Sequence, residues 1–362
     1  MVDVLVVGGG MAGVSIAYEL AAHASVLLAE AEPTLAEHTT GRSAAIYAPS
    51  YGSPVVRALT VASGPRYRAL ETELDTPPLL TPHGSLWVAV DDDGAGRVEA
   101  LPAEPVSPRQ ARELCPVLRD VRAAVWDDTA SDIDVMALHQ GYVRGLRARG
   151  GTIRNSSPVT ATNRDGAGWR VTVGEDEIGA DLVVNAAGAW ADELAAKAGV
   201  PAIGLRPLRR TLALASGAAE VDPAWPLVAD AADRFYFRPE GFRLLISPAD
   251  ETPSEPCDAK PDELDVALAI ERINAATTLG LRSVHIAWAG LRSFVADRNP
   301  VVGAWPEHPG FAGQGGYGIQ MAPALAVLGA AVVLDRPVPG DLPARDVSPG
   351  RSANQVVDGG DH

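Results

Sequence analysis

The chain has 362 residues, of which 47% are hydrophobic and 21% charged, and its formal net charge at pH 7 is −16. This length exceeds one ordinary domain, and the apolar fraction suffices for a large buried core. The 46 Asp and Glu against 30 Lys and Arg would repel phosphate backbones and anionic lipid headgroups. The composition therefore argues against a nucleic-acid partner and against peripheral membrane binding.

Cysteine and histidine usage predicts no metal site and no disulfide framework. Cys115 and Cys257 are too few for either, and the seven histidines are scattered along the chain. Asp3 stands where a signal peptide would carry a basic residue. The longest apolar stretch, residues 321–334, contains Pro323 and Gly329 and is too short to span a bilayer. We expect a cytoplasmic protein without an integral membrane segment.

The first residues follow the order of a dinucleotide-binding unit. Strands are predicted over residues 4–7 and 25–29, with a helix over 11–23 between them. Gly8, Gly10 and Gly13 form a GxGxxG motif that allows a tight turn, close approach to a pyrophosphate and close helix packing. Glu30, at the end of the second strand, suits the hydroxyls of an adenosine ribose. The unit predicts NAD or FAD rather than a glycine turn without a ligand.

The middle of the chain alternates between irregular and regular patterns. Residues 91–94 (DDDG) are interpreted as a solvated turn, and glycines at 166–168 as the turn of a hairpin. A buried strand over 181–184 leads into a second glycine-containing element at 185–190 and a helix. Further elements are predicted as helices at 55–74, 108–114 and 135–149 and strands at 85–90 and 169–173.

The last third begins with strands and ends with helices. Strands are predicted at 211–214, 235–238 and 244–246, and helices at 262–276 and 320–334. The Pro- and Gly-rich residues from 336 onward are expected to fray.

The segment after Glu30 favours FAD over NAD. Residues 39–45 (TTGRSAA) are small and polar with one arginine, which lets the chain pass close to an extended FAD, whereas a nicotinamide dehydrogenase would continue its parallel sheet here. The element at 185–190 also fits an FAD fold. Neither cysteine lies near residues 288–320, so we expect the FAD to be non-covalent.

The predicted fold class is α/β, with a Rossmann-like FAD-binding domain interleaved with a β-rich α+β substrate-binding domain. The FAD-binding domain is assigned to residues 1–50, 135–197 and 288–345. The substrate-binding domain takes 51–134 and 198–287, and residues 346–362 form a flexible tail.

The chain resembles the D-amino acid oxidase family of FAD-dependent amine oxidoreductases, and within it the bacterial D-arginine dehydrogenases. The resemblance runs to about residue 335 and is carried by VVGGGMAG near the start, TTGRSAA, YGSPVVRALT, DIDVMALHQGY, VVNAAGAWAD, WAGLRSFVAD and GQGGYGIQ. Besides the glycine motif and Glu30, it implies cofactor contacts at Met11, Ala12, Ala31, Thr40, Gly41, Arg42, Ser43, Ala44, Ala45, Val159, Ala187, Gly188, Trp190, Arg292, Gly315, Gly316, Tyr317, Gly318 and Ile319. The helix beginning near Gln320 would point its positive end at the flavin.

The same resemblance implies a catalytic set of Tyr51, Arg210, Tyr236 and Arg292. The chemistry requires such a set, because a guanidinium fixes a carboxylate by geometry as well as by charge. Arg292 lies in the WAGLRSF motif. Arg210 follows Arg209, and the pair could instead form a solvated edge, whereas Tyr236 could be a core aromatic. Tyr51 lies in a loop that resembles the family's lid and would exclude water.

The substrate pocket departs from the D-arginine enzymes. The glutamate that binds the guanidinium there aligns with Ser85, and the active-site histidine is replaced by Ile46, with Ala48 close by and Gly315 also implied in the pocket. Losing a charge-assisted partner costs about 1.5–3 kcal/mol. The pocket is therefore predicted to be less anionic, and to prefer a neutral or hydrophobic D-amino acid over D-arginine.

The predicted reaction is oxidative deamination: hydride passes from Cα to flavin N5, and the imine hydrolyses to a 2-oxo acid and ammonia. The partners are then an amino acid or amine substrate and oxygen or another electron acceptor. A secondary amine of the sarcosine or N-alkyl amino acid type stays open, as does a flavin hydroxy-acid dehydrogenase, although Ile46 removes the histidine that could serve as its base. A non-catalytic flavin-binding module is disfavoured by the tyrosine and arginine set.

Overall fold

The computed structural model describes residues 1–304 and 318–354. Within them, one sheet has the strand order β10-β11-β12-β1-β2-β9. Strands β12, β1, β2 and β9 run parallel, and β10 and β11 extend the sheet as antiparallel strands. The bounds are β1 (Val2–Val7), β2 (Val26–Ala29), β9 (Thr152–Arg154), β10 (Val159–Asp165), β11 (Gly168–Val173) and β12 (Asp176–Asn185).

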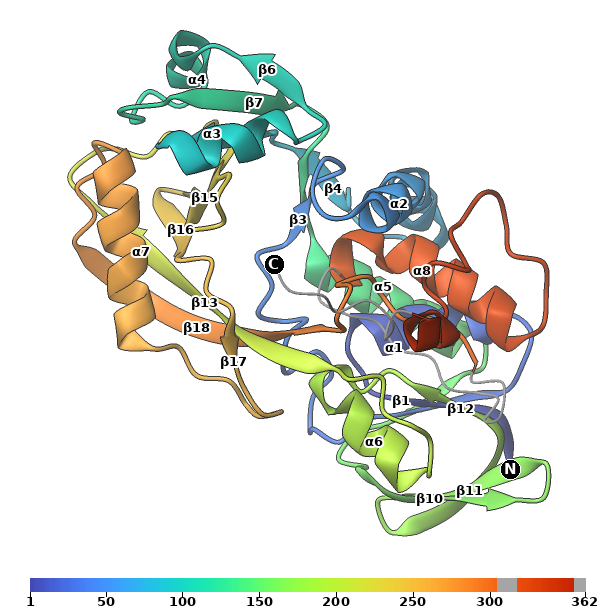
Figure 1. Cartoon of the computed structure of the whole chain (residues 1–362). Helices are drawn as coiled ribbons and strands as arrows, with labels where there is room; N and C mark the ends of the chain where they lie inside the picture. The colour runs from blue at the N-terminus through green and yellow to red at the C-terminus, as the bar shows by residue number, and fades with distance from the viewer. Residues whose placement is uncertain (305–317, 355–362) are drawn as a thin grey trace.

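Helices bury both faces of this sheet. Alternation along β1 sends Val4 and Val6 into a core shared with the helices on one face, whereas Leu5 and Val7 face Trp169 and other residues on the opposite side. The first face carries α1 (Met11–Leu20), α2 (Pro54–Glu73), α5 (Val135–Ala148) and α8 (Gly318–Val333), and the second α6 (Ala191–Lys197), after the 3₁₀ turn η1 (Gly188–Trp190). Figure 1 shows α1, α5 and α8 stacked over the sheet.

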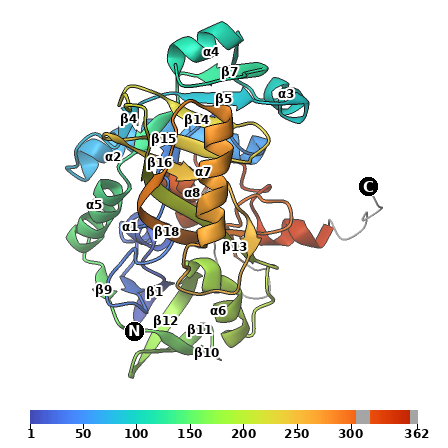
Figure 2. The same cartoon turned by 90° about the vertical axis from the view of Figure 1, so that its left-hand side faces the viewer.

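A larger, mostly antiparallel sheet forms the other half of the molecule. Its order is β17-β13-β16-β15-β14-β5-β7-β6, and β18 pairs with β13 as well. The bounds are β5 (Ser85–Ala89), β6 (Glu104–Val106), β7 (Ala123–Asp127), β13 (Arg206–Ser216), β14 (Leu227–Asp230), β15 (Tyr236–Glu240), β16 (Arg243–Ser247), β17 (Thr252–Pro253) and β18 (Ser283–Phe294). Helix α7 (Glu263–Ala276) covers one face, as Figure 2 shows, and its Ala269 and Ile273 enter that core.

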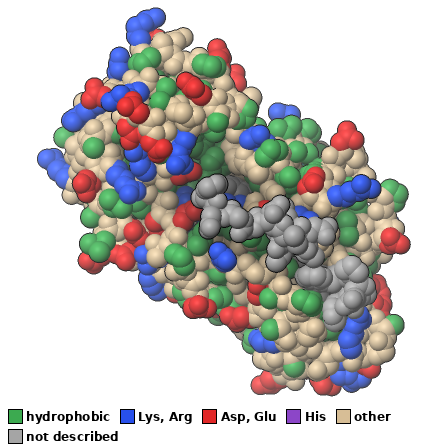
Figure 3. Space-filling view, in the orientation of Figure 1, with side chains coloured by type: hydrophobic (Ala, Val, Ile, Leu, Met, Phe, Trp, Pro, Cys, Tyr) green, Lys and Arg blue, Asp and Glu red, His purple; other side chains and the backbone are tan. Residues whose placement is uncertain are grey.

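The remaining elements connect and cover these two sheets. A small sheet pairs β3 (Ile46–Tyr47), β8 (Ser131–Ile133) and β4 (Leu80–Pro82). Helices α3 (Asp92–Glu99) and α4 (Pro108–Leu114) lie beside the larger sheet, and the 3₁₀ turn η2 (Pro349–Asn354) ends the described chain. On the face shown in Figure 3, acidic and basic side chains are interspersed. No helix within the described ranges has the length and apolarity needed to cross a membrane.

The pairing of β13 with β18 joins two segments that are far apart in the sequence. Arg210 lies opposite Gly290, and Arg292 lies opposite Leu208. Because the side-chain period of a strand is two, Arg210 and Arg292 are diagonal neighbours on one face of the pair. Arg209 points to the other face, where its guanidinium bonds Asp265 at 2.8 Å and Asp262 at 3.3 Å. The two adjacent arginines therefore do not form a solvated edge.

The structure corrects two predictions about local order. The predicted solvated turn at 91–94 is instead the start of α3, because the Asp91 side chain accepts a hydrogen bond from Gly94 N and caps the helix. The residues from 336 onward are not frayed throughout: Val347 is fully buried, and Val302 N donates to its carbonyl at 2.7 Å. The ion pair of Arg351 with Asp297 holds the start of the predicted tail as well.

The domain boundaries stay a prediction, but one of them falls within a strand. The boundary assigned at residue 288 falls inside β18, which continues unbroken to Phe294. A single strand therefore crosses the assigned boundary.

The ion pair of His83 with Asp132 should make stability depend on pH. His83 Nδ1 lies 2.8 Å from Asp132 Oδ2, and this bond raises the pKa of His83 despite its partial burial. A raised folded-state pKa gives stabilisation that is complete below about pH 6.5 and is lost as pH rises through the folded value. Urea unfolding of His83→Gln should show a loss of about 1 kcal/mol at pH 5.5 and a smaller loss at pH 8.5. An equal loss at both pH values would contradict this assignment.

Candidate active site

One cavity of about 500 Å³ lies where the parallel strands end against the β13–β18 pair. Its walls come from the turns after β1, β2 and β12, because the carboxyl ends of parallel strands meet at one edge of a sheet. Most of the predicted site residues line it: Gly8, Gly10, Met11, Ala12, Glu30, Ala31, Thr40, Arg42, Ser43, Ala44, Ala45, Ile46, Ala48, Tyr51, Val159, Ala187, Gly188, Trp190, Arg210, Tyr236, Arg292, Gly318 and Ile319.

The glycine turn is packed too tightly for side chains. Gly8 has φ +112°, and a Cβ there would lie 2.3 Å from the Ala186 carbonyl oxygen. A Cβ on Gly13 would lie 1.8 Å from Gly8 O, so Gly13 serves helix packing and does not itself line the cavity. His139 is buried beside the turn, with its Nε2 atom 2.9 Å from the backbone oxygen of Gly9. Burial lowers the pKa of His139, which fits a neutral structural imidazole.

Glu30 is fixed by backbone groups around it. Its carboxylate accepts from Gly9 N at 2.6 Å and from Glu32 N at 2.9 Å. Each oxygen retains a further lone pair for a ligand hydroxyl. The carboxylate is thus held at the end of β2, directly beside the glycine turn.

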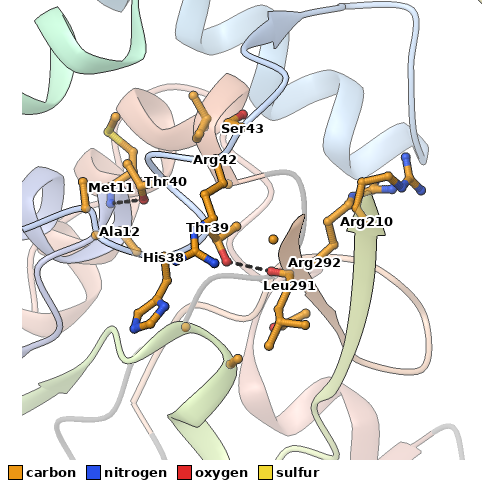
Figure 4. Close-up of a pocket in the computed structure, with 18 of the residues that line it drawn as sticks. Met11, Ala12, His38, Thr39, Thr40, Arg42, Ser43, Arg210, Leu291 and Arg292 are labelled. Carbon is orange, nitrogen blue, oxygen red and sulfur yellow. Dashed lines mark hydrogen bonds between the residues drawn. The ribbon is translucent and has the colours of Figure 1, made fainter. Parts of the chain in front are cut away.

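The segment at 39–45 joins the glycine turn to β18. Thr40 Oγ1 accepts from Met11 N at 2.9 Å, and Thr39 Oγ1 donates to Leu291 O at 2.9 Å (Figure 4). The Arg42 guanidinium donates to the carbonyls of Ala259 and Ala289 at 3.0 and 3.2 Å. Arg42 lines the cavity, but these bonds show that it ties the segment to the larger sheet.

His38 is a cavity residue that the sequence did not single out. Its Nε2 lies 3.0 Å from Glu32 Oε1, and its ring lies 4.8 Å from that of Trp190. Its Nδ1 is buried with no hydrogen-bond partner among the described residues. A histidine among polar residues carries no spacing signal, so only the fold could reveal its place near Trp190.

The four residues of the predicted catalytic set meet at the other end of the cavity. The Arg210 guanidinium lies 6.0 Å from the centre of the Tyr236 ring, within cation–π range. The ring of Tyr51 stacks on that of Trp87, with centres 5.1 Å apart. Arg210 and Arg292 come from adjacent strands, and Figure 4 shows both at the same side of the cavity.

Glu251 binds both of these arginines, and no sequence pattern singled it out. Its Oε1 lies 3.3 Å from Arg210 Nη2, 3.3 Å from Arg292 Nη1 and 2.6 Å from Arg298 Nη2. Burial acts to raise the pKa of Glu251, but the bonds to Arg298 and the charges of the other two arginines outweigh it, and the pKa is lowered. Glu251 is therefore an anion that orients the two guanidinium groups.

A second acidic side chain, Asp233, faces the same cavity. It lies in the turn between β14 and β15 with φ +54° and is exposed. Desolvation by the surrounding protein raises the pKa of the Asp233 carboxyl group. The positive charges of Arg210 and Arg292 act to lower this pKa but offset the rise only in part. The pocket was predicted to be less anionic, but it contains the carboxylate of Asp233, which lies in none of the sequence motifs.

Some predicted residues lie elsewhere. Ser85 is fully buried at the start of β5, and neither it nor Gly41 lines the cavity. The strand instead presents Trp87 to the cavity, so the role predicted for Ser85 has no support from its position. Gly315, Gly316 and Tyr317 fall outside the described residues. Neither cysteine lines the cavity, with Cys115 buried and Cys257 exposed.

The family profile described as FAD dependent oxidoreductase matches residues 3–332 of the chain. The chain belongs to this family. It is 28% identical to the bovine FAD-dependent oxidoreductase domain-containing protein 1, over 92% of this chain and 81% of that protein. It is 25% identical to glycine oxidase of Pseudomonas putida, over 89% and 92%. It is also 26% identical to rat dimethylglycine dehydrogenase, in a match that covers 68% of this chain but only 30% of that protein.

Solved structures show the same fold. The L-proline dehydrogenase from P. horikoshii superposes with a TM-score of 0.86 at 20% identity, covering 97% of this chain and 98% of that one. Glycine oxidase from Geobacillus kaustophilus gives a TM-score of 0.82 at 21% identity, covering 97% and 98%. The predicted FAD-binding fold with mixed α/β sheets is confirmed, and the cofactor of this family is FAD. The narrower likeness to D-arginine dehydrogenases stays a prediction.

The residues of the cavity fit FAD. The glycine turn removes side chains from the end of α1, where backbone N–H groups and the helix dipole suit a pyrophosphate. Trp87 and Ser293 line the cavity, and Trp87 Nε1 and Ser293 Oγ are buried with no hydrogen-bond partner within the described ranges. Since buried polar groups are normally paired, these atoms point to ligand or water partners. Glu30, beside the turn, fits the adenosine ribose.

Glu30→Ala should weaken FAD binding. The change removes the acceptor of two backbone N–H groups and the ribose partner, so we expect the Kd for FAD to rise at least about tenfold. Flavin fluorescence on titration of apoprotein measures this, with the exposed Glu175→Ala as a matched control. An unchanged Kd in Glu30→Ala would show that Glu30 does not contact the cofactor.

Proposed function

We propose that this chain oxidises an amino acid whose carboxylate binds Arg292 and Arg210. The single observation that carries the proposal is the convergence of these two arginines, diagonal neighbours across β13 and β18, on the cavity that the glycine turn also lines. Similarity to glycine oxidase, dimethylglycine dehydrogenase and L-proline dehydrogenase supports an amino acid or N-alkyl amino acid as the substrate class.

The chain's own residues would bind and align the substrate. Arg210 Nε donates a hydrogen bond to the backbone carbonyl of Asp250 at 2.7 Å, and Arg210 Nη2 contacts Glu251, so the guanidinium plane is fixed before a ligand arrives. A fixed guanidinium sets the orientation of a bound carboxylate and hence of the adjacent Cα–H. Tyr51 and Trp87 form a stacked aromatic wall that excludes water. Bound FAD supplies the acceptor for the hydride that leaves Cα.

We further propose a neutral or hydrophobic D-amino acid as substrate, with a 2-oxo acid and ammonia as final products. The D configuration rests on the motif resemblance. The apolar character rests on Ile46, Ala48, Trp87 and Leu212, which line the cavity. Assays of D-Leu, D-Met and D-Phe against D-Arg and against the L enantiomers test this directly. A preference for D-Arg would contradict it.

A secondary amine is the second candidate, because dimethylglycine dehydrogenase and L-proline dehydrogenase are among the similar proteins. Turnover of sarcosine or other N-methyl amino acids with release of an aldehyde would favour it. Peroxide formation in air would distinguish an oxidase from a dehydrogenase that uses another electron acceptor.

Arg292→Leu should abolish most activity while leaving the protein yellow. The change removes a charge-assisted partner of the substrate carboxylate, so kcat/KM should fall by about 10- to 100-fold, with FAD content unchanged. Steady-state kinetics and the flavin absorbance measure the two effects. Arg109→Leu, on the exposed face of α4, is the control. An unchanged kcat/KM in Arg292→Leu would exclude this carboxylate site.

A further inference from the structure

Asp233 occupies a rigid turn whose other charged groups are already paired. The turn connects β14 to β15, and Asp233 N donates to Asp230 O at 3.0 Å. Arg234 donates to both carboxylate oxygens of Asp230, at 2.6 and 2.9 Å, and also binds Asp91. Arg272 holds the turn through the Arg234 carbonyl at 2.7 Å. These bonds fix the backbone that carries Asp233.

The Asp233 carboxylate itself makes no hydrogen bond or ion pair with the described residues. It is exposed and lines the cavity that Arg210, Tyr236 and Arg292 also line. Both arginines influence it through charge, yet both direct guanidinium N–H groups to Glu251 instead. A carboxylate beside two arginines would ordinarily pair with one of them. Here Glu251 takes that role and leaves Asp233 open to the cavity.

We propose that Asp233 accepts a hydrogen bond from the amino group of the bound substrate. This inference rests on the proposed function, since it assumes that Arg210 and Arg292 bind the carboxylate of the same molecule. An α-amino acid carries its amino group one carbon from its carboxylate. Two arginines with an unpaired carboxylate close by complement that arrangement of charges.

Such a contact would select amines over other carboxylic acids. A 2-hydroxy acid offers one hydroxyl donor and no positive charge, and a simple carboxylic acid offers neither. Glu251 and Asp233 together place two acidic groups around the arginines, which disfavours an anion that brings no positive charge of its own. Asp233 is therefore the residue that would distinguish an amino acid from its hydroxy-acid analogue.

Asp233→Asn tests the proposal, because Asn has the same shape and tolerates a positive φ. The probes are D-leucine, which carries an amino group, and 4-methylpentanoate, which is the same molecule without it. Binding is followed from the flavin absorbance, by anaerobic stopped flow for D-leucine and by titration for 4-methylpentanoate. We expect the Kd for D-leucine to rise at least about tenfold, and that for 4-methylpentanoate to stay unchanged or fall.

Two controls separate the possible outcomes. Asp120→Asn removes one exposed negative charge that does not line the cavity and should change neither Kd. Asp233→Gly suits the positive φ and removes the carboxylate, so it serves if the Asn variant fails to fold. An equal change for both probes, or no change for either, in the Asp233 variants would overturn the proposal.

Failure of the proposed function gives a different result. If amino acids of every class leave the wild-type flavin oxidised under anaerobic conditions, the proposed function itself is wrong. If D-leucine reduces the wild-type flavin but binds Asp233→Asn with unchanged affinity, only the role of Asp233 is wrong.

Discussion

The register between β13 and β18 is the constraint on which the rest of the site depends. It places Arg210 opposite Gly290 and Arg292 opposite Leu208, so that both arginines share the face of the pair that meets the cavity. A slip of one residue would turn Arg292 to the opposite face and separate the two guanidinium groups. The glycine at position 290 leaves room beside Arg210, and the 39–45 segment packs there through Thr39. One strand pair thus carries the two arginines and also contacts the 39–45 segment beside the glycine turn.

The cavity near Arg210 and Arg292 contains charged side chains of both signs and is not simply a positive patch. Arg210, Arg292 and Arg298 share the Glu251 carboxylate, which holds their side chains in place without a ligand. Asp233 adds a second acidic group that is open to the cavity. Preorganised charges cost little reorganisation when a ligand binds, because the guanidinium groups are already held in place. The net charge of −16 on the whole chain carries no information about this arrangement.

Local sequence patterns predicted the nucleotide-binding half well. The apolar run before Gly8 became β1, and the helix predicted over 135–149 is α5, which ends one residue earlier. These features depend on near neighbours in the chain. Glu251, Asp233 and His38 escaped prediction, because each acquires its role only when distant segments meet. Ser85 shows the reverse: an aligned motif position marked it as a pocket residue, but the start of β5 is fully buried. The helix at 92–99 was missed because the sequence DDDG at 91–94 is also typical of a turn. Its first aspartate is in fact the N-cap of the helix.

We propose that one cavity brings FAD and an amino acid together through Arg292 and Arg210. Anaerobic addition of a panel of amino acids, N-methyl amino acids and 2-hydroxy acids to the yellow wild-type protein tests it most directly. We expect at least one neutral amino acid to bleach the flavin absorbance rapidly, and the matching hydroxy acid to bleach it slowly or not at all. Bleaching by hydroxy acids alone, or by no member of the panel, would contradict it.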